Sequence, residues 1–188
     1  MVEIDPFVTQ IAEHLCAKSI RFARPKVKGR GVAPPLWLLD LGVFRSWSGP
    51  RTWDLCFGKD AACLEDPVDV TQTICAEAIV ARRLERAGYT AGWSSAYRAP
   101  PPASWIPRIG FSSAQDVIRP AFPKVAASIG LGGTPDVFGH RGLSDLVFIE
   151  VKRDPDRLKV EQVAWFETAL AAGVQPARLL VAVWATEA

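Results

Sequence analysis

Residues 146–151 form a run of apolar, β-branched and aromatic side chains that contains one carboxylate, Glu150, and is followed by Lys152. Such a run is typical of a strand buried on both faces, inside a mixed or parallel sheet. Because side chains alternate along a strand, Glu150 and Lys152 are expected on the same face. Burying two charges on a strand costs free energy unless the charges pair with each other or bind an ion. The run therefore predicts an α/β fold with a functional strand end.

A second carboxylate, Asp136, follows Pro135 and precedes a short apolar segment at residues 137–139. If residues 140–142 form a turn, this segment pairs with the buried strand as a hairpin and brings Asp136 near Glu150. Two close carboxylates raise each other's pKa, and a divalent cation removes that conflict. Oxygen ligands favour Mg²⁺ or Mn²⁺. We therefore expect Asp136, Glu150 and the backbone carbonyl of Val151 to hold the metal ion.

This residue set suits the hydrolysis of a phosphodiester. A bound metal ion lowers the pKa of a water molecule and shields the phosphate charge. Lys152 is expected to orient that water or to stabilise the charge of the transition state. The alternative is an ordinary hairpin with an exposed ion pair at a strand end, because the Glu-X-Lys triplet is common on its own.

The segment after the lysine, residues 154–173, predicts a helix with apolar residues at helical spacing and Gly173 at its end. Asp154 or Asp156 is expected to cap this helix. Gln162 lies on or beside the packed face, where its amide needs a hydrogen-bond partner. The alternative is an amide on the helix surface. Residues 178–184 are expected to form a last strand.

Four short motifs and a closing Gly173 follow one another in this part of the chain: Gly133-Thr134-Pro135-Asp136, Phe148-Ile149-Glu150-Val151-Lys152, Asp156-Arg157-Leu158 and Glu161-Gln162-x-x-Trp165. In this order and spacing they resemble the VRR-NUC branch of the PD-(D/E)XK nucleases, over about residues 130–184. The resemblance implies a restriction-endonuclease-like core. It also implies that Asp136 and Glu150 are metal ligands, that Lys152 is the catalytic lysine, and that Gln162 supports the site.

The same resemblance implies a magnesium-dependent endonuclease that acts on DNA. Members of this branch that stand alone tend to cut branched DNA such as Holliday junctions, often as homodimers. One alternative within enzymes is a restriction-type, phage-defence or toxin nuclease. The alternative from another class is a DNA-binding member of the fold that has lost catalysis.

The resembled family also carries a glutamate on a helix that precedes the sheet. Within the helix expected over residues 70–87, Glu77 shares a face with apolar residues three, four and seven positions further on. An inward-pointing Glu77 would ligate the metal ion or bind its water shell. The alternative is a solvated carboxylate that pairs with a neighbouring arginine.

The net charge of +2 says little by itself, but the cations are unevenly distributed. Residues 18–30 contain six cations and no acid, so this stretch suits contacts to backbone phosphates. A solvated connector is the alternative. The residues expected to bind nucleic acid are Arg157, Arg153 and Lys159 beside the site, and Lys26, Lys28 and Arg30 in the basic stretch.

The expected organisation is an N-terminal extension of unknown role at residues 1–69, packed on a nuclease core at residues 70–188. The core is expected to hold a mixed sheet of about four strands flanked by helices, with a proline-rich insertion at about residues 99–123. The extension and this insertion are the candidate surfaces for a protein partner. Further elements are expected as a helix at 6–20, strands at 36–43, 52–58 and 90–99, and a loop over 100–123.

The longest apolar runs are far shorter than a membrane span. The N-terminus is acidic and has no signal-peptide pattern. These features predict a cytoplasmic protein that does not associate with a membrane.

Overall fold

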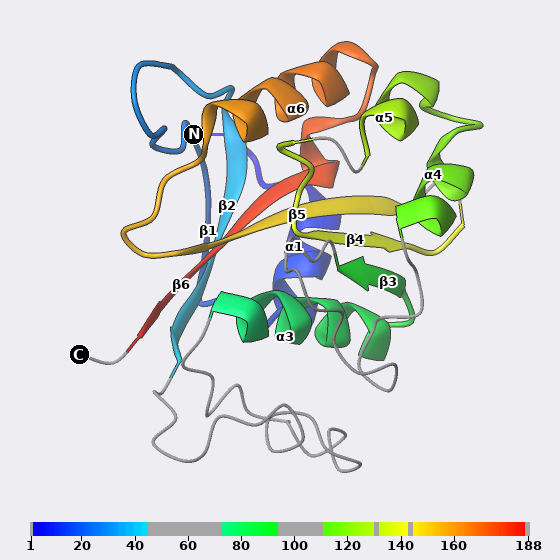
Figure 1. Cartoon of the computed structure of the whole chain (residues 1–188). Helices are drawn as coiled ribbons and strands as arrows, with labels where there is room; N and C mark the ends of the chain where they lie inside the picture. The colour runs from blue at the N-terminus through cyan, green and yellow to red at the C-terminus, as the bar shows by residue number, and fades with distance from the viewer. Residues whose placement is uncertain (1, 45–72, 94–110, 130–131, 143–144, 187–188) are drawn as a thin grey trace.

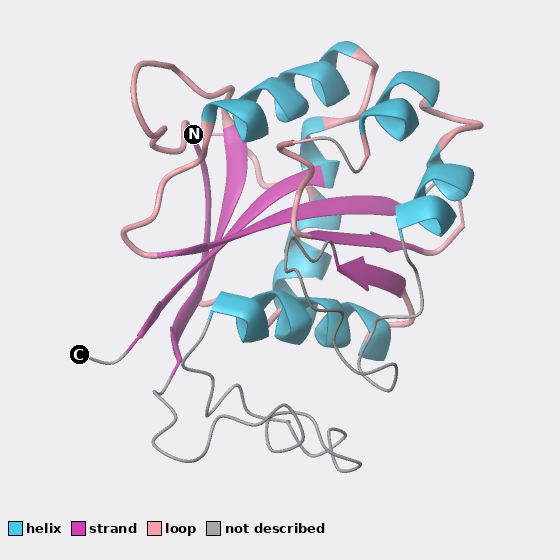
Figure 2. Cartoon of the chain, viewed as in Figure 1, coloured by secondary structure: helices cyan, strands magenta, loops and turns pink. Residues whose placement is uncertain are grey.

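Among the residues that the structure describes, a mixed sheet of six strands with helices on both faces makes this chain an α/β protein (Figures 1 and 2). The structure is a computed structural model, and it describes residues 2–44, 73–93, 111–129, 132–142 and 145–186. The elements are α1 (Pro6–His14), β1 (Ser19–Ala23), β2 (Leu36–Phe44), α3 (Thr73–Arg86), β3 (Thr90–Trp93), α4 (Phe111–Ile118), α5 (Pro123–Ser128), β4 (Val137–His140), β5 (Leu146–Arg153), α6 (Val160–Ala171), η2 (Pro176–Arg178) and β6 (Leu179–Thr186).

The strand order is β1-β2-β6-β5-β4-β3. β2, β6 and β5 are parallel neighbours, whereas β1, β4 and β3 are joined by antiparallel pairing. Central strands covered by helices on both sides must be apolar on both faces, and β5 is buried from Leu146 to Val151. The predicted mixed sheet flanked by helices is confirmed. The predicted count of about four strands is wrong, because the N-terminal part of the chain adds β1 and β2 to the same sheet.

Two hydrophobic clusters lie on the two faces of the sheet. The first joins α1 and α3 to the sheet and includes Val80 and Ile149. The second joins α5 and α6 to the other face and includes Phe148 and Phe166. Figure 1 shows α3 and α6 on opposite sides of the strands. Each fully buried side chain of this kind contributes about 1.5–3 kcal/mol to the free energy of unfolding. Packing against the helices on both faces therefore stabilises the sheet.

The first helix ends earlier than the predicted residue 20. The Asp5 side chain caps α1 by accepting from the Phe7 backbone N–H at 2.8 Å. Cys16 has a φ of 52°, a left-handed conformation that stops a helix. Residues 19–23 then pair antiparallel with β2 as an edge strand. Their alternation of apolar and polar side chains has the period of a strand, which the prediction of a long helix overlooked.

The proline-rich region also differs from the prediction. Residues 111–118, expected as loop, form helix α4. No proline occurs between residues 108 and 119, so the backbone N–H groups of this stretch are free to close helical hydrogen bonds. Pro120 follows the helix, and Pro123 occupies the first turn of α5, where proline is tolerated.

Some predicted features lie outside the described residues. They include the strand at residues 52–58, the first part of the proline-rich insertion, and the boundary between residues 69 and 70. Within the described ranges, no helix has both the length and the apolar character that crossing a membrane requires.

Candidate active site at the end of β5

The hairpin of β4 and β5 brings two carboxylates together. Val137 pairs with Ile149 in the antiparallel register, so Asp136 comes opposite Glu150, as the sequence predicted. The backbone N–H of Val151 donates to Asp136 Oδ2 at 2.9 Å. This hydrogen bond fixes the Asp136 side chain against β5 at the point where β4 begins.

Glu150 is the most deeply buried charged group of the site. Its side chain has no exposed surface, and its Oε1 atom binds both the Lys152 ammonium and the Gln162 side-chain amide. Its second oxygen, Oε2, is buried without a hydrogen-bond partner among the described residues. Since an unpaired buried carboxylate oxygen is costly, Oε2 is a position at which a further ligand would be stabilising.

Burial and mutual repulsion govern the protonation of this cluster. Burial raises the pKa of Glu150 well above its usual value, and the Asp136 charge raises it further against the opposing effect of Lys152. Burial also raises the pKa of Asp136, although Lys152 and the Val151 N–H oppose it. Burial lowers the pKa of Lys152, but the charges of Glu150 and Asp136 outweigh it, so this pKa is raised. Lys152 therefore remains a cation beside two acids that hold their protons more tightly than usual.

Gln162 connects helix α6 to this cluster. Its Oε1 atom accepts from the Lys159 backbone N–H at 2.8 Å, while its Nε2 atom donates to Glu150. The side chain is 8% exposed, so it is not a surface amide. The predicted cap by Asp154 or Asp156 is wrong, because Leu158 is buried ahead of the helix and the N-cap position falls on Lys159.

Glu77 approaches the site from α3, on the other side of the sheet from α6. Its side chain is only 6% exposed, and its Oε2 atom is buried without a hydrogen-bond partner among the described residues. Burial raises the pKa of Glu77 to about 8, helped by the Asp136 charge and opposed by Lys152. Glu77 is therefore an inward-facing acid and not a solvated one.

The oxygen atoms of this site suit a hard divalent cation. Within the described part of the chain, no three Asp, Glu, His or Cys side chains converge closely enough to form a metal cluster alone. The pair Asp136 and Glu150 supplies two carboxylates, and the partnerless oxygens of Glu150 and Glu77 leave capacity for a cation. Carboxylate oxygens are typical of Mg²⁺ or Mn²⁺ sites that also keep several water ligands. The residues present therefore fit such an ion.

A short bridge places two basic segments side by side next to the site. Val27 and Leu158 form a parallel β-bridge, with Lys28 N–H donating to Leu158 O at 2.8 Å and Leu158 N–H donating to Lys26 O at 3.0 Å. Val27 and Leu158 both pack into the core, so their neighbours project outwards. We call these exposed neighbours the bridge cations: Lys26, Lys28, Arg157 and Lys159.

The loop that carries two of these cations borders the acidic cluster. The Lys159 charge lowers the pKa of Asp136, and the Asp156 charge raises that of Lys152. Arg153 is exposed and lies over the Trp184 ring, 5.9 Å from its centroid. Arg30 is also exposed, two residues beyond Lys28. All six residues that were predicted to contact nucleic acid are therefore exposed, and acidic residues lie between some of them in the sequence.

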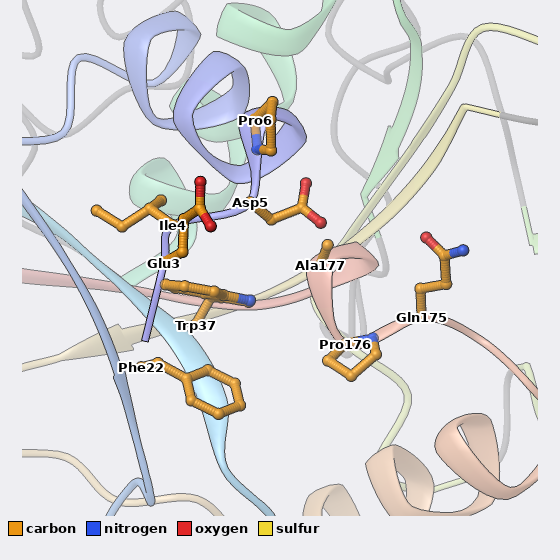
Figure 3. Close-up of a pocket in the computed structure, with 9 residues that line it drawn as sticks. All are labelled: Glu3, Ile4, Asp5, Pro6, Phe22, Trp37, Gln175, Pro176 and Ala177. Atoms are coloured by element: carbon orange, nitrogen blue, oxygen red, sulfur yellow. The ribbon is translucent and has the colours of Figure 1, made fainter. Parts of the chain in front are cut away.

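A separate pocket of about 630 Å³ lies at the opposite ends of the parallel strands. Figure 3 shows Phe22 and Trp37 below the acidic residues Glu3 and Asp5, with Pro176 across from them. None of the predicted site residues lines it. Its carboxylates would repel a phosphate backbone, so this pocket is not part of the candidate active site.

No family model, curated protein or solved structure matches the chain. The site is therefore defined by its own geometry. Asp136, Glu150, Lys152 and Gln162 meet at one strand end, and Glu77 faces them from the other layer. Sequence reasoning missed the Val27–Leu158 bridge, although each of its two residues is an apolar position between two cations.

Proposed function

We propose that this chain is a Mg²⁺- or Mn²⁺-dependent nuclease that hydrolyses phosphodiester bonds in DNA. The observation that carries the proposal is the convergence of Asp136, Glu150 and Lys152 at the end of β5. A lysine held between two acids, with a glutamine from another element behind one of them, has the composition of a hydrolytic site. An exposed hairpin ion pair would not need full burial of Glu150 or a partner from α6.

In this proposal, Asp136, Glu150 and the Val151 carbonyl hold the cation, with Glu77 as a direct or water-mediated ligand. The bound ion would neutralise phosphate charge and acidify a water molecule. Lys152 orients the attacking water and offsets negative charge as the new P–O bond forms and the P–O bond to the leaving nucleotide breaks. Gln162 keeps the Glu150 carboxylate in place. The attacking water would release its proton to solvent, and the leaving oxygen would take a proton from solvent.

The expected substrate is DNA, bound through backbone phosphates. The bridge cations and the exposed Arg30 and Arg153 form a positively charged border beside the acids, suited to contacts that do not depend on sequence. We further propose membership of the VRR-NUC branch with a restriction-endonuclease-like core. Branched DNA, a homodimer and a cytoplasmic location are the expectations that accompany this membership.

Cleavage of a labelled panel tests the proposal. The panel contains a Holliday junction, a flap, a splayed arm, linear duplex and single strands, each incubated with Mg²⁺, Mn²⁺ or EDTA. The Lys152→Ala variant is assayed in parallel with the unsubstituted chain. Lys124→Ala is a matched control, because Lys124 is an exposed lysine on α5 that takes no part in the acidic cluster.

The expected result is cutting that requires a metal ion, is lost in Lys152→Ala and persists in Lys124→Ala. Lys124→Ala should remain folded because Lys124 is exposed, and circular dichroism checks the fold of Lys152→Ala, which removes a partner of the buried Glu150. Full activity of Lys152→Ala would refute the assignment. Failure to cut any substrate with either metal would favour the inactive DNA-binding alternative.

A further inference from the structure

A pocket of about 510 Å³ lies on the half of the sheet formed by β1, β2 and β6. Its lining includes two cations, Lys18 and Arg21, and two acids, Asp40 and Asp154. We call it the β1–β2 pocket. None of the residues assigned to hydrolysis lines it, so it is distinct from the acidic cluster, although Asp154 follows β5 directly.

The strand register places the Arg21 side of this pocket on the sheet face that carries Glu150 and Lys152, whereas Leu39 and Trp184 in its lining belong to the other face. Glu150 pairs with Val181 of β6, Val181 with Leu38 of β2, and Leu38 with Arg21 of β1. Residues that are paired across neighbouring strands project to the same face. Arg21 and Glu150 are therefore two ends of one cross-strand row.

The next row towards the carboxyl ends of the parallel strands joins Lys152 to Val183, then to Asp40 and finally to Ser19. Leu38 and Val181 in the first row are buried, whereas Asp40 and Ser19 in this row are exposed. The core that α6 covers therefore ends between the two rows. Beyond it, among the described residues, the row runs from the partly buried Lys152 and Val183 to the exposed Asp40 and Ser19.

Two local contacts organise the polar groups of the pocket. The Gly42 N–H donates to Asp40 Oδ1 at 2.8 Å, so this carboxylate is held by its own strand. The Lys18 side chain lies against Gly42, where a Cβ atom would come within 2.4 Å of Lys18 Cε. Gly42, with a φ of 78°, leaves the space in which Lys18 lies. The Lys18 ammonium is thus held near the pocket while Arg21 is exposed at its edge.

We propose that the β1–β2 pocket binds a phosphate and its nucleotide on the substrate strand, away from the bond that is cut. The proposal rests on the nuclease function proposed above. Three strand spacings separate β5 from β1, which is about 14 Å. At about 3.4 Å per stacked nucleotide, this span corresponds to about four nucleotides. Arg21 and Lys18 contact the phosphate, and the strand runs over β6 and β2 to Lys152.

DNA binding by chains that cannot cut tests the pocket separately from catalysis. Every protein carries Lys152→Ala, and fluorescence anisotropy of a fluorescein-labelled splayed-arm DNA is followed in EDTA over a range of salt concentrations. Arg21→Ala and Lys18→Ala remove the two cations, and Asp154→Asn removes an acid from the same pocket. Arg119→Ala is the matched control, because Arg119 is an exposed arginine 64% accessible in its side chain and follows α4.

Arg21→Ala should raise the Kd about three- to tenfold and reduce the slope of log K against log salt by about one. Lys18→Ala should act in the same direction, whereas Asp154→Asn should tighten binding. The site is overturned if Arg21→Ala and Lys18→Ala both bind like Arg119→Ala, or if the parent does not bind DNA. If the chain that retains Lys152 cuts DNA in a metal-dependent way but neither Arg21→Ala nor Lys18→Ala weakens binding, only the pocket is rejected. If Arg21→Ala weakens binding but the chain that retains Lys152 cuts no substrate, the pocket is retained and the nuclease is rejected.

Discussion

Gln162 of α6 and Glu150 of β5 are joined by a hydrogen bond in which the amide Nε2 donates to the carboxylate Oε1. The other end of the same amide accepts from the Lys159 backbone N–H at 2.8 Å. Because one end must donate and the other must accept, these two contacts fix the orientation of the amide. The start of α6 and the buried acid of β5 are therefore coupled through one side chain.

Replacing Gln162 by alanine should weaken both the site and the fold. Glu150 would lose a donor and the Lys159 N–H would lose its acceptor, which costs about 1–3 kcal/mol in the free energy of unfolding. Loss of a group that orients a metal ligand lowers metal affinity or activity about 10- to 100-fold. Denaturant unfolding and cleavage rates measure the two effects. Gln175→Ala, at an exposed glutamine before η2, should change neither.

A bound divalent cation should stabilise the folded chain. Binding to the native state alone adds about 2.7 kcal/mol when the free ion is at 100 times its Kd. Thermal unfolding in Mn²⁺ and in EDTA measures this difference. Asp136→Asn and Glu150→Gln should abolish the metal-dependent rise in Tm. Asp116→Asn should keep it, because Asp116 is exposed on α4. An equal rise in all four proteins would place the cation elsewhere.

Glu77 should make the metal-free chain less stable as the pH rises. Its pKa of about 8 in the folded chain exceeds the usual value of 4.5. Between these values the unfolded chain releases a proton that the folded chain keeps, so the free energy of unfolding falls with pH. The contribution is complete below pH 4.5 and is lost as the pH passes through about 8. It amounts to a few kcal/mol, at about 1.4 kcal/mol for each pKa unit.

The measurement is denaturant unfolding in EDTA between the two pH limits. Glu77→Gln should flatten the pH dependence and gain stability relative to the parent at the upper limit. The part contributed by Glu150, which has the same sign, remains in both proteins. Glu167→Gln, at an exposed position on α6, is the control. An unchanged slope in Glu77→Gln would show that this acid does not titrate in the window.

Local patterns were sufficient to predict the acidic strand end. The apolar run at residues 146–151 and the short spacing to Asp136 define a hairpin, and period-two alternation then sets the side of each charge. The inward face of Glu77 also followed from helical spacing. These features depend on residues that are close in sequence, within about one hairpin or one helix. Their pattern can therefore be recognised in a single sequence.

The features that were missed depend on contacts distant in sequence. Nothing local shows that Val27 pairs with Leu158, or that β2 lies beside β6. The edge strand β1 was missed because the alternation over residues 19–23 is short and directly follows a helix, although pairing with β2 stabilises it as a strand. The β1–β2 pocket depends on the same pairings, so it could not be predicted before the sheet order was known.

Gly133 should be required for the contact between α6 and the site. It has a φ of 91°, and a Cβ atom there would lie 2.1 Å from Glu161 O and 2.8 Å from Gln162 N. Gly133→Ala must therefore move the first turn of α6 as well as strain its own backbone. We expect a loss of about 1–3 kcal/mol in the free energy of unfolding and slower cleavage, because Gln162 would move away from Glu150.

The neighbouring glycine provides a closely matched control for this substitution. A Cβ atom at Gly132 meets nothing within 4 Å, so Gly132→Ala should leave stability and cleavage nearly unchanged. Denaturant unfolding and single-turnover cleavage of both variants separate the effects of strain and of site displacement. If Gly133→Ala loses stability but cuts at the parent rate, the first turn of α6 does not need its present position for catalysis. Equal behaviour of the two variants would mean that α6 does not pack against Gly133 in solution.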